Sequence, residues 1–141
     1  MSELMTALML WIAAATGLPP TPSTPAVAFE NKDTLYTLLY GKAPGARSFA
    51  EVLAVYDTPA RTVRLREGWD RNDPIHVSVL LHELVHHLQL EADVKYDCRG
   101  AMEKVAYDAQ RSFLAERGIE MEKALELDPM FLLFVTSCGG D

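Results

Sequence analysis

Residues 80–89 read LLHELVHHLQ and contain His82, Glu83 and His86 in the order His-Glu-x-x-His. On a helix, two histidines four residues apart lie one above the other on the same face, so both imidazoles can reach one metal ion. Glu83 follows His82 by about 100° around the helix axis. Its carboxylate would lie near the metal and could accept a proton from metal-bound water. The stretch therefore predicts a helix that carries two metal ligands and a general base.

The residues around this motif are mostly apolar, which predicts that the helix is largely buried. A chance match to so short a motif is roughly a one-in-a-hundred event at this composition. A buried helix rarely carries two histidines and a glutamate unless something satisfies them. We therefore favour a metal site, and the alternative is a pair of core histidines that hydrogen-bond to carbonyls or to each other. The apolar neighbours are Leu80, Leu81, Leu84, Val85 and Leu88.

The sequence HELVH of residues 82–86 resembles the motif of the zincin metallopeptidases. The metzincin branch also requires glycine at position 89 and histidine at position 92, where this chain has Gln89 and Ala92, so that branch is excluded. The chain as a whole resembles a small bacterial family of minimal gluzincin-like domains. In gluzincins a glutamate on the next helix is the third metal ligand. The resemblance implies a zincin-like fold and a metal site, but no particular substrate.

The third ligand is expected shortly after the motif. Glu91 and Asp93 continue the same helix or its end and cannot easily fold back, whereas Asp97 and Cys98 lie in a predicted loop. Glu103 lies on the next predicted helix, beside an apolar stripe, so its carboxylate should face a neighbouring helix. Together with the gluzincin resemblance, this makes Glu103 the predicted third ligand. The alternative is a first-turn glutamate that interacts with the helix dipole. The stripe consists of Met102, Ala106, Ala109 and Phe113.

Two departures from the large gluzincin peptidases concern the region around Glu103. Sixteen residues separate His86 from Glu103, fewer than in those peptidases, which suggests a cleft that is shallow or lacks a wall. One helical turn further on, Tyr107 occupies the position of an aspartate that supports a histidine in those peptidases. Its hydroxyl could hydrogen-bond a ligand or stabilise an oxyanion, and otherwise it is a core tyrosine. His76 and His87 are expected to be structural or exposed.

Length and charge limit the functions that need to be considered. We expect residues 1–141 to form one domain and to act as a monomer. The net charge of −7 makes nucleic acid an improbable partner, because phosphate binding requires clustered Lys and Arg. The apolar run Leu8–Ala15 is too short to span a membrane, and we interpret it as part of a core-packing helix. An export signal preceding Met1 remains compatible with this interpretation.

Cys98 and Cys138 do not belong to a Cys-x-x-Cys pair, which argues against a structural zinc site. We favour a disulfide between them, because the Gly-rich tail around Cys138 otherwise has nothing to hold it. The alternative is two free thiols. The disulfide would favour an exported or periplasmic protein, and free thiols would favour a cytoplasmic one.

The fold expected from these patterns is α+β and zincin-like, mostly helical, with a small sheet packed on the motif helix. The sheet would consist of a β-hairpin plus an edge strand, and the apolar run 129–135 should be buried. Asp73 and Pro74 mark the start of the motif helix. Expected helices are 1–16, 34–40, 75–90, 101–116 and a weaker one at 120–127, and expected strands are 26–29, 51–56 and 61–66.

The strand Arg61–Arg66 alternates Val63 and Leu65 with arginines, so it cannot be buried on both sides and is predicted to be the edge strand. In zincins a peptide substrate pairs with the edge strand beside the motif helix. The alternative is an ordinary solvated edge that its charges keep from aggregating. The arginines make acidic peptides conceivable substrates.

The functional hypothesis is a zinc-dependent metallopeptidase that acts on peptides or proteins. In it His82, His86 and Glu103 bind Zn²⁺, Glu83 is the general base, and Tyr107 is a further catalytic candidate. The alternative is a metal-stabilised binding module of zincin fold with little or no hydrolytic activity.

Overall fold

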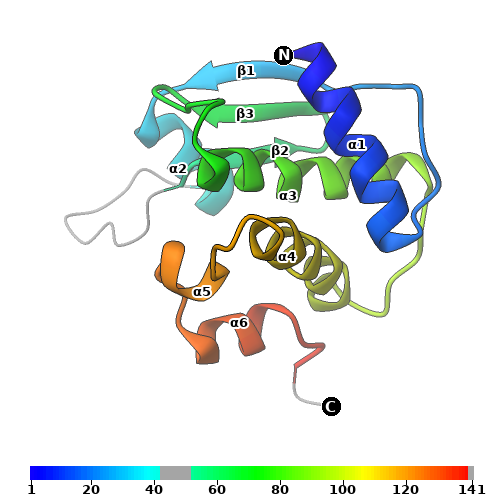
Figure 1. Cartoon of the computed structure of the whole chain (residues 1–141), viewed down its shortest axis with the longest axis vertical. Helices are drawn as coiled ribbons and strands as arrows, with labels where there is room; N and C mark the ends of the chain where they lie inside the picture. Colours follow the sequence, from blue (N-terminus) through cyan, green and yellow to red (C-terminus); the bar gives the residue numbers. More distant parts are fainter. Residues whose placement is uncertain (42–51, 140–141) are drawn as a thin grey trace.

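The computed structural model of the chain describes residues 1–41 and 52–139, so Glu51 of the predicted hairpin and the predicted loop 42–48 lie outside the described residues. Helices and a small mixed sheet build the molecule, and the predicted α+β class is confirmed (Figure 1). The elements in chain order are α1 (Ser2–Thr16), β1 (Ala26–Glu30), α2 (Lys32–Tyr40), β2 (Ala54–Asp57), β3 (Thr62–Arg66), α3 (Pro74–Glu91), α4 (Arg99–Ala115), α5 (Met121–Ala124) and α6 (Pro129–Val135).

Helix α3, which carries the motif, lies at the centre of the fold (Figure 1). The Oδ1 atom of Asp73 accepts a hydrogen bond from the amide of Ile75, and Pro74 is the first helical residue, as the sequence predicts. The sheet lies on one side of α3, and α1 and α4 also pack against it. Burial on several sides explains why its apolar residues do not form a single stripe. The fully buried apolar residues of α3 are Leu80, Leu81, Leu84, Val85 and Leu88.

The strands have the order β1-β3-β2, with β1 parallel and β2 antiparallel to β3. The hairpin of β2 and β3 is therefore confirmed, but the prediction that Arg61–Arg66 is an edge strand is wrong. Strand β3 is the central strand, because β1 pairs with its other side. Its apolar face is fully buried, and Arg64 on the opposite face pairs with Asp57 of β2 and Glu30 of β1. Strand β2 is an edge strand of the sheet. It packs against α3 more extensively than β3 does.

Helix α1 ends at Gly17, which adopts a left-handed conformation. Its buried face contains Met5, Leu8, Met9 and Ile12, which agrees with the predicted core-packing helix. The helix packs against α3 and α4 as a core element. Within the ranges 1–41 and 52–139, no helix is long and apolar enough to cross a bilayer.

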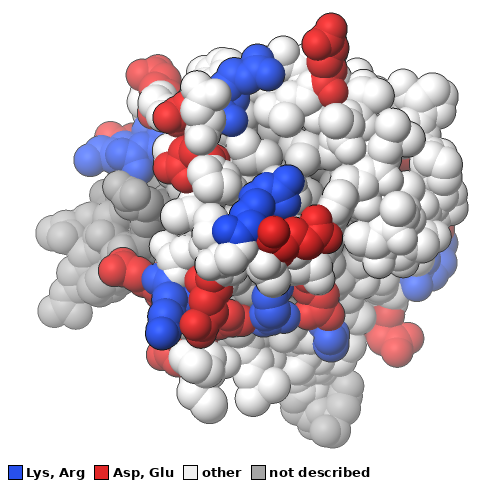
Figure 2. All heavy atoms as spheres, viewed as in Figure 1, with Lys and Arg blue, Asp and Glu red and all other residues white. Residues whose placement is uncertain are grey.

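Charged side chains alternate in sign over the lower part of the face shown in Figure 2, where α4 and α5 lie. Lys104 and Arg111 of α4 both pair with Asp108, and Arg111 also pairs with Glu122 of α5. The basic groups on this face are therefore partly neutralised by acidic neighbours.

The C-terminal segment differs most from the prediction. Leu132 is the one residue of α6 that is buried, whereas Met130, Phe131, Leu133 and Phe134 are exposed. The prediction that this apolar run is buried is wrong, because a seven-residue helix that packs on α4 can bury one side only. Of the predicted helix 120–127, Met121–Ala124 is helical.

The predicted disulfide between Cys98 and Cys138 is present, with the Cα atoms 5.5 Å apart. It joins the N-cap of α4 to the segment that follows α6. Gly100 in the first turn of α4 lies so close to the backbone of Ser137 that a Cβ atom at position 100 would overlap the Ser137 carbonyl. The tail is thus fixed against the same turn of α4 that leads to Glu103.

Replacing both cysteines by alanine should lower the free energy of unfolding by about 4 kcal/mol, because the disulfide closes a loop of 40 residues. Denaturant unfolding of the oxidised chain and of the double variant measures this difference. An unchanged free energy of unfolding would show that the bond does not constrain the unfolded chain.

Candidate metal centre

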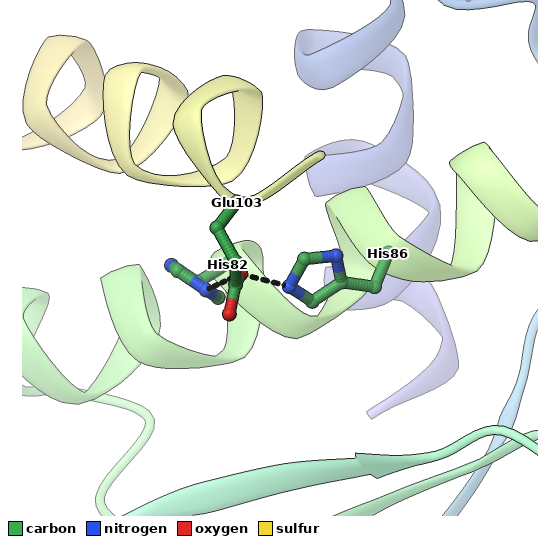
Figure 3. Close-up of side chains that lie close together, drawn as sticks. All are labelled: His82, His86 and Glu103. Atoms are coloured by element: carbon green, nitrogen blue, oxygen red, sulfur yellow. Dashed lines mark hydrogen bonds and ion pairs between the residues drawn. The ribbon is translucent and has the colours of Figure 1, made fainter. Parts of the chain in front are cut away.

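Three of the predicted site residues lie together where α3 and α4 cross. His82 and His86 extend from successive turns of α3, and Glu103 reaches between them from α4 (Figure 3). The Oε1 atom of Glu103 lies 3.1 Å from Nε2 of His82 and 2.6 Å from Nε2 of His86. Both histidine side chains are at most 10% exposed. The helical spacing of four residues and the crossing of the two helices together produce this cluster.

The other third-ligand candidates lie elsewhere. Glu91 pairs with Arg61, Asp93 pairs with Lys95, Cys98 is in the disulfide, and Asp97 is exposed outside the cluster. Among the described residues, His82, His86 and Glu103 form the group that could hold a metal ion.

Each histidine is oriented by a glutamine that the sequence analysis did not select. Nδ1 of His82 lies 2.9 Å from Oε1 of Gln110, whose Nε2 donates to Oγ of Ser78. Nδ1 of His86 lies 2.8 Å from Oε1 of Gln89, whose Nε2 donates to the carbonyl of Met102. Because both amide NH₂ groups have acceptors, both amide oxygens face the rings, and each Nδ1 must donate a proton.

This arrangement fits a metal ion. A neutral imidazole that donates from Nδ1 has a lone pair on Nε2, and both Nε2 atoms face the Glu103 carboxylate. Three lone-pair donors that face one another in a buried site require a proton or a cation between them. Their donor atoms lie within 4.8 Å of one another, close to the span of two zinc–ligand bonds of about 2.0–2.2 Å each. Two histidines and a glutamate form a ligand set of catalytic zinc sites.

The charges within the cluster stabilise one another. Burial alone would raise the pKa of Glu103, but His82 and His86, whose protonated forms donate hydrogen bonds from Nε2, outweigh it and hold that pKa well below its usual range. Burial alone would lower the pKa of His86, but the hydrogen bond to Glu103 and the charges of Glu83 and Glu103 raise it above its usual value. The ionised form of Glu103 and the protonated form of His86 therefore stabilise each other.

Glu83 is held between α3 and the edge strand. Its Oε1 atom accepts a hydrogen bond of 3.1 Å from the amide of Tyr56 in β2. The Tyr56 hydroxyl lies 2.8 Å from Nδ1 of His87, whose Nε2 lies 2.7 Å from the carbonyl of Ser23. Both contacts of His87 are structural, which agrees with the role predicted for it. Burial raises the pKa of Glu83, against the lowering effect of the histidines, which makes its carboxylate a better proton acceptor.

Tyr107 lies beside His82, with ring centroids 4.5 Å apart in an edge-on arrangement. Burial, together with the charges of Glu103 and Glu83, raises the pKa of Tyr107 to about 12. Its hydroxyl therefore stays protonated at neutral pH and can donate a hydrogen bond.

Two cavities, of about 410 Å³ and about 820 Å³, lie beside the cluster; all three cluster residues line the smaller one, and of the three His82 alone lines the larger one. Both are lined by His82, Glu83 and Tyr107. The larger one is also lined by residues 124–128 and Phe131, so the C-terminal segment forms one of its walls. The short connection from His86 to Glu103 had suggested a cleft that is shallow or lacks a wall. His76 lines this cavity too and accepts a hydrogen bond from the amide of Asp70 at Nδ1.

Comparison with known proteins gives one match. A family model described as a domain of unknown function (DUF6647) matches residues 1–139. No curated protein and no solved structure matches the chain.

Replacing Gln110 by leucine should weaken zinc binding about 10- to 100-fold, because His82 would lose the hydrogen bond that fixes its ring and tautomer. Competition with a chromophoric chelator measures the zinc affinity. The matched variant Gln110→Glu keeps an acceptor for Nδ1 and should retain tight binding. Equal zinc affinities of the Gln110→Leu variant and the unchanged chain would contradict this role.

Proposed function

The chain belongs to the DUF6647 family, whose function is unknown, and we propose that it is a zinc-dependent peptidase of the gluzincin type. The observation that carries the proposal is the convergence of His82, His86 and Glu103 at the wall of one cavity, with Glu83 beside them. The ligand set, the buried carboxylate and the access from outside are the parts that a hydrolytic site requires.

In this proposal Nε2 of each histidine and Oε1 of Glu103 hold the zinc ion, while Gln110 and Gln89 keep the rings in place. When bound there, zinc would polarise the scissile carbonyl and lower the pKa of a coordinated water.

Glu83 moves the proton. Its carboxylate takes a proton from the attacking water and passes it to the leaving amine nitrogen. The raised pKa of Glu83 suits this role, because a base whose pKa is closer to neutral accepts and releases a proton more readily. Its hydrogen bond to Tyr56 keeps one carboxylate oxygen in place during this exchange.

Strand β2 is suited to align an extended substrate. The amide of Arg66 donates to the carbonyl of Leu53, so in the antiparallel ladder Leu53, Val55 and Asp57 direct their backbone groups towards β3. The backbone groups of Ala54 and Tyr56 then face away from β3. The contact between Tyr56 and Glu83 shows that this edge faces the candidate site. Because the amide of Tyr56 donates to Glu83, a peptide that adds to this edge would pair with the carbonyl of Tyr56 and the backbone groups of Ala54.

Tyr107 would act on the substrate oxygen. A hydroxyl with a pKa of about 12 remains a donor at neutral pH, and an oxyanion that develops beside the metal would accept its hydrogen bond. Tyr107 lines both cavities, so an occupant of either one would contact it.

The disulfide supports an exported or periplasmic location, because such bonds persist in oxidising compartments. In this proposal the chain acts there as a monomer on peptides or unfolded proteins.

Replacing Glu83 by glutamine should lower cleavage of a denatured protein about 10²- to 10⁴-fold, because the variant lacks the proton acceptor. Mass spectrometry of new termini, with the zinc-loaded chain, measures cleavage. The variant should still bind zinc, since Glu83 is outside the ligand set. The matched variant Glu67→Gln changes an exposed glutamate and should cleave at the original rate.

Cleavage that persists unchanged in the Glu83→Gln variant would overturn the hydrolytic mechanism. A chain that never cleaves, but whose melting temperature rises with zinc, would instead be a metal-stabilised binding module.

A further inference from the structure

We propose that the larger cavity binds a segment of the peptide substrate that combines large apolar side chains with lysine or arginine. This inference rests on the proposed peptidase function and adds a substrate class to it. The cavity of about 820 Å³ extends from the metal cluster between β2 and the C-terminal segment, and α2 and α5 lie towards the same side of the molecule in Figure 1.

The cavity offers apolar surface that a substrate can cover. Leu39 of α2 and Phe131 of α6 both line it and are 46% and 48% exposed. Leu53, Ile75 and Leu127 line it between these two. Large side chains left half-exposed around a concave surface favour an apolar occupant, since binding removes their area from water.

The described lining of the cavity is predominantly acidic. Asp73, Glu126 and Asp128 belong to it, it contains no Lys or Arg, and Asp73 lies 3.7 Å from Nε2 of His76. Asp73 and Asp128 each use Oδ1 to cap a helix, at the starts of α3 and α6. Glu126 is exposed. A basic side chain in the segment would therefore meet a negative field in a partly enclosed space.

Two of the arginines that suggested acidic substrates are already paired with acidic residues of the chain. Arg61 pairs with Glu91, and Arg64 pairs with Asp57 and Glu30. These arginines lie on or beside the central strand of the sheet and already have acidic partners, so they do not form a basic strip at the edge.

The cavity adjoins the metal cluster at His82, which lines it together with Glu83 and Tyr107. In the proposed peptidase, a segment bound there would therefore lie next to the reacting groups. Acidic groups disfavour an anionic lipid surface as the occupant, and the net charge of −7 disfavours a second copy of the chain. A basic, apolar peptide is the occupant that matches both the shape and the charge.

The test uses the zinc-loaded Glu83→Gln chain and fluorescence anisotropy with three labelled peptides of equal length. One peptide contains leucine, phenylalanine and lysine, the second has glutamate in place of lysine, and the third has serine in place of the apolar residues. We expect the first to bind at least about tenfold more tightly than either of the others.

Adding Phe131→Ala to the same chain should weaken binding of the first peptide about fivefold or more. The matched change Phe134→Ala removes a side chain of α6 that is 78% exposed and outside the cavity lining, and should leave binding unchanged. Glu126→Lys should reduce the preference for lysine over glutamate.

Equal binding of the lysine and glutamate peptides would overturn the inference. So would equal losses from Phe131→Ala and Phe134→Ala, or a change of oligomeric state by Phe131→Ala without an effect on peptide binding. If the unchanged chain cleaves proteins without this preference, the peptidase proposal stands and the inference fails. If the preference is found but the unchanged chain never cleaves, the peptidase proposal fails, and the cavity is a binding site for such peptides instead of a substrate subsite.

Discussion

Two imidazole nitrogens and one carboxylate oxygen face one another in a buried space between α3 and α4. Because Gln110 and Gln89 each accept a hydrogen bond from Nδ1 of a histidine, the Nε2 atoms of the neutral rings are left with lone pairs directed at Glu103. Bare lone pairs at such distances repel one another, so the site is stable only with a positive charge at its centre. A proton can supply that charge, and a divalent cation supplies it with three bonds at once.

Much of the surrounding structure keeps these three atoms in place. The hydrogen bond from Tyr56 to Glu83 connects the motif helix with the sheet, and His87 connects the same tyrosine with the segment before β1. On the other side, the disulfide and the close contact of Gly100 with Ser137 fix the beginning of α4. Glu103 lies one turn after that anchored end, so the position of its carboxylate depends on the packing of the tail.

The parts that local patterns determine could be predicted. The start of α3 follows from Asp73 and Pro74, the pairing of His82 with His86 follows from helical spacing, and Glu103 follows from its place on the next helix. The position of β1 beside β3 could not be predicted, because that parallel pairing joins residues far apart in the sequence and has no turn signal. Because this pairing was not predicted, the sequence of β3 indicated an edge strand, although β3 is the central strand.

Two other features escaped prediction for chemical reasons. Gln89 and Gln110 are neutral residues without a distinctive spacing, and only their burial beside the histidines shows what they do. The exposure of α6 could not be predicted, because an apolar run indicates burial but not how many neighbours are available.

The central claim is that the buried cluster binds one zinc ion. The most direct measurement is the metal content of the chain purified without chelator, combined with anomalous diffraction at the zinc absorption edge. The account predicts one zinc ion per chain, within bonding distance of His82, His86 and Glu103, and its loss in the Glu103→Ala variant. A chain that holds no zinc in the presence of excess metal, or that binds it equally well without Glu103, would contradict the account.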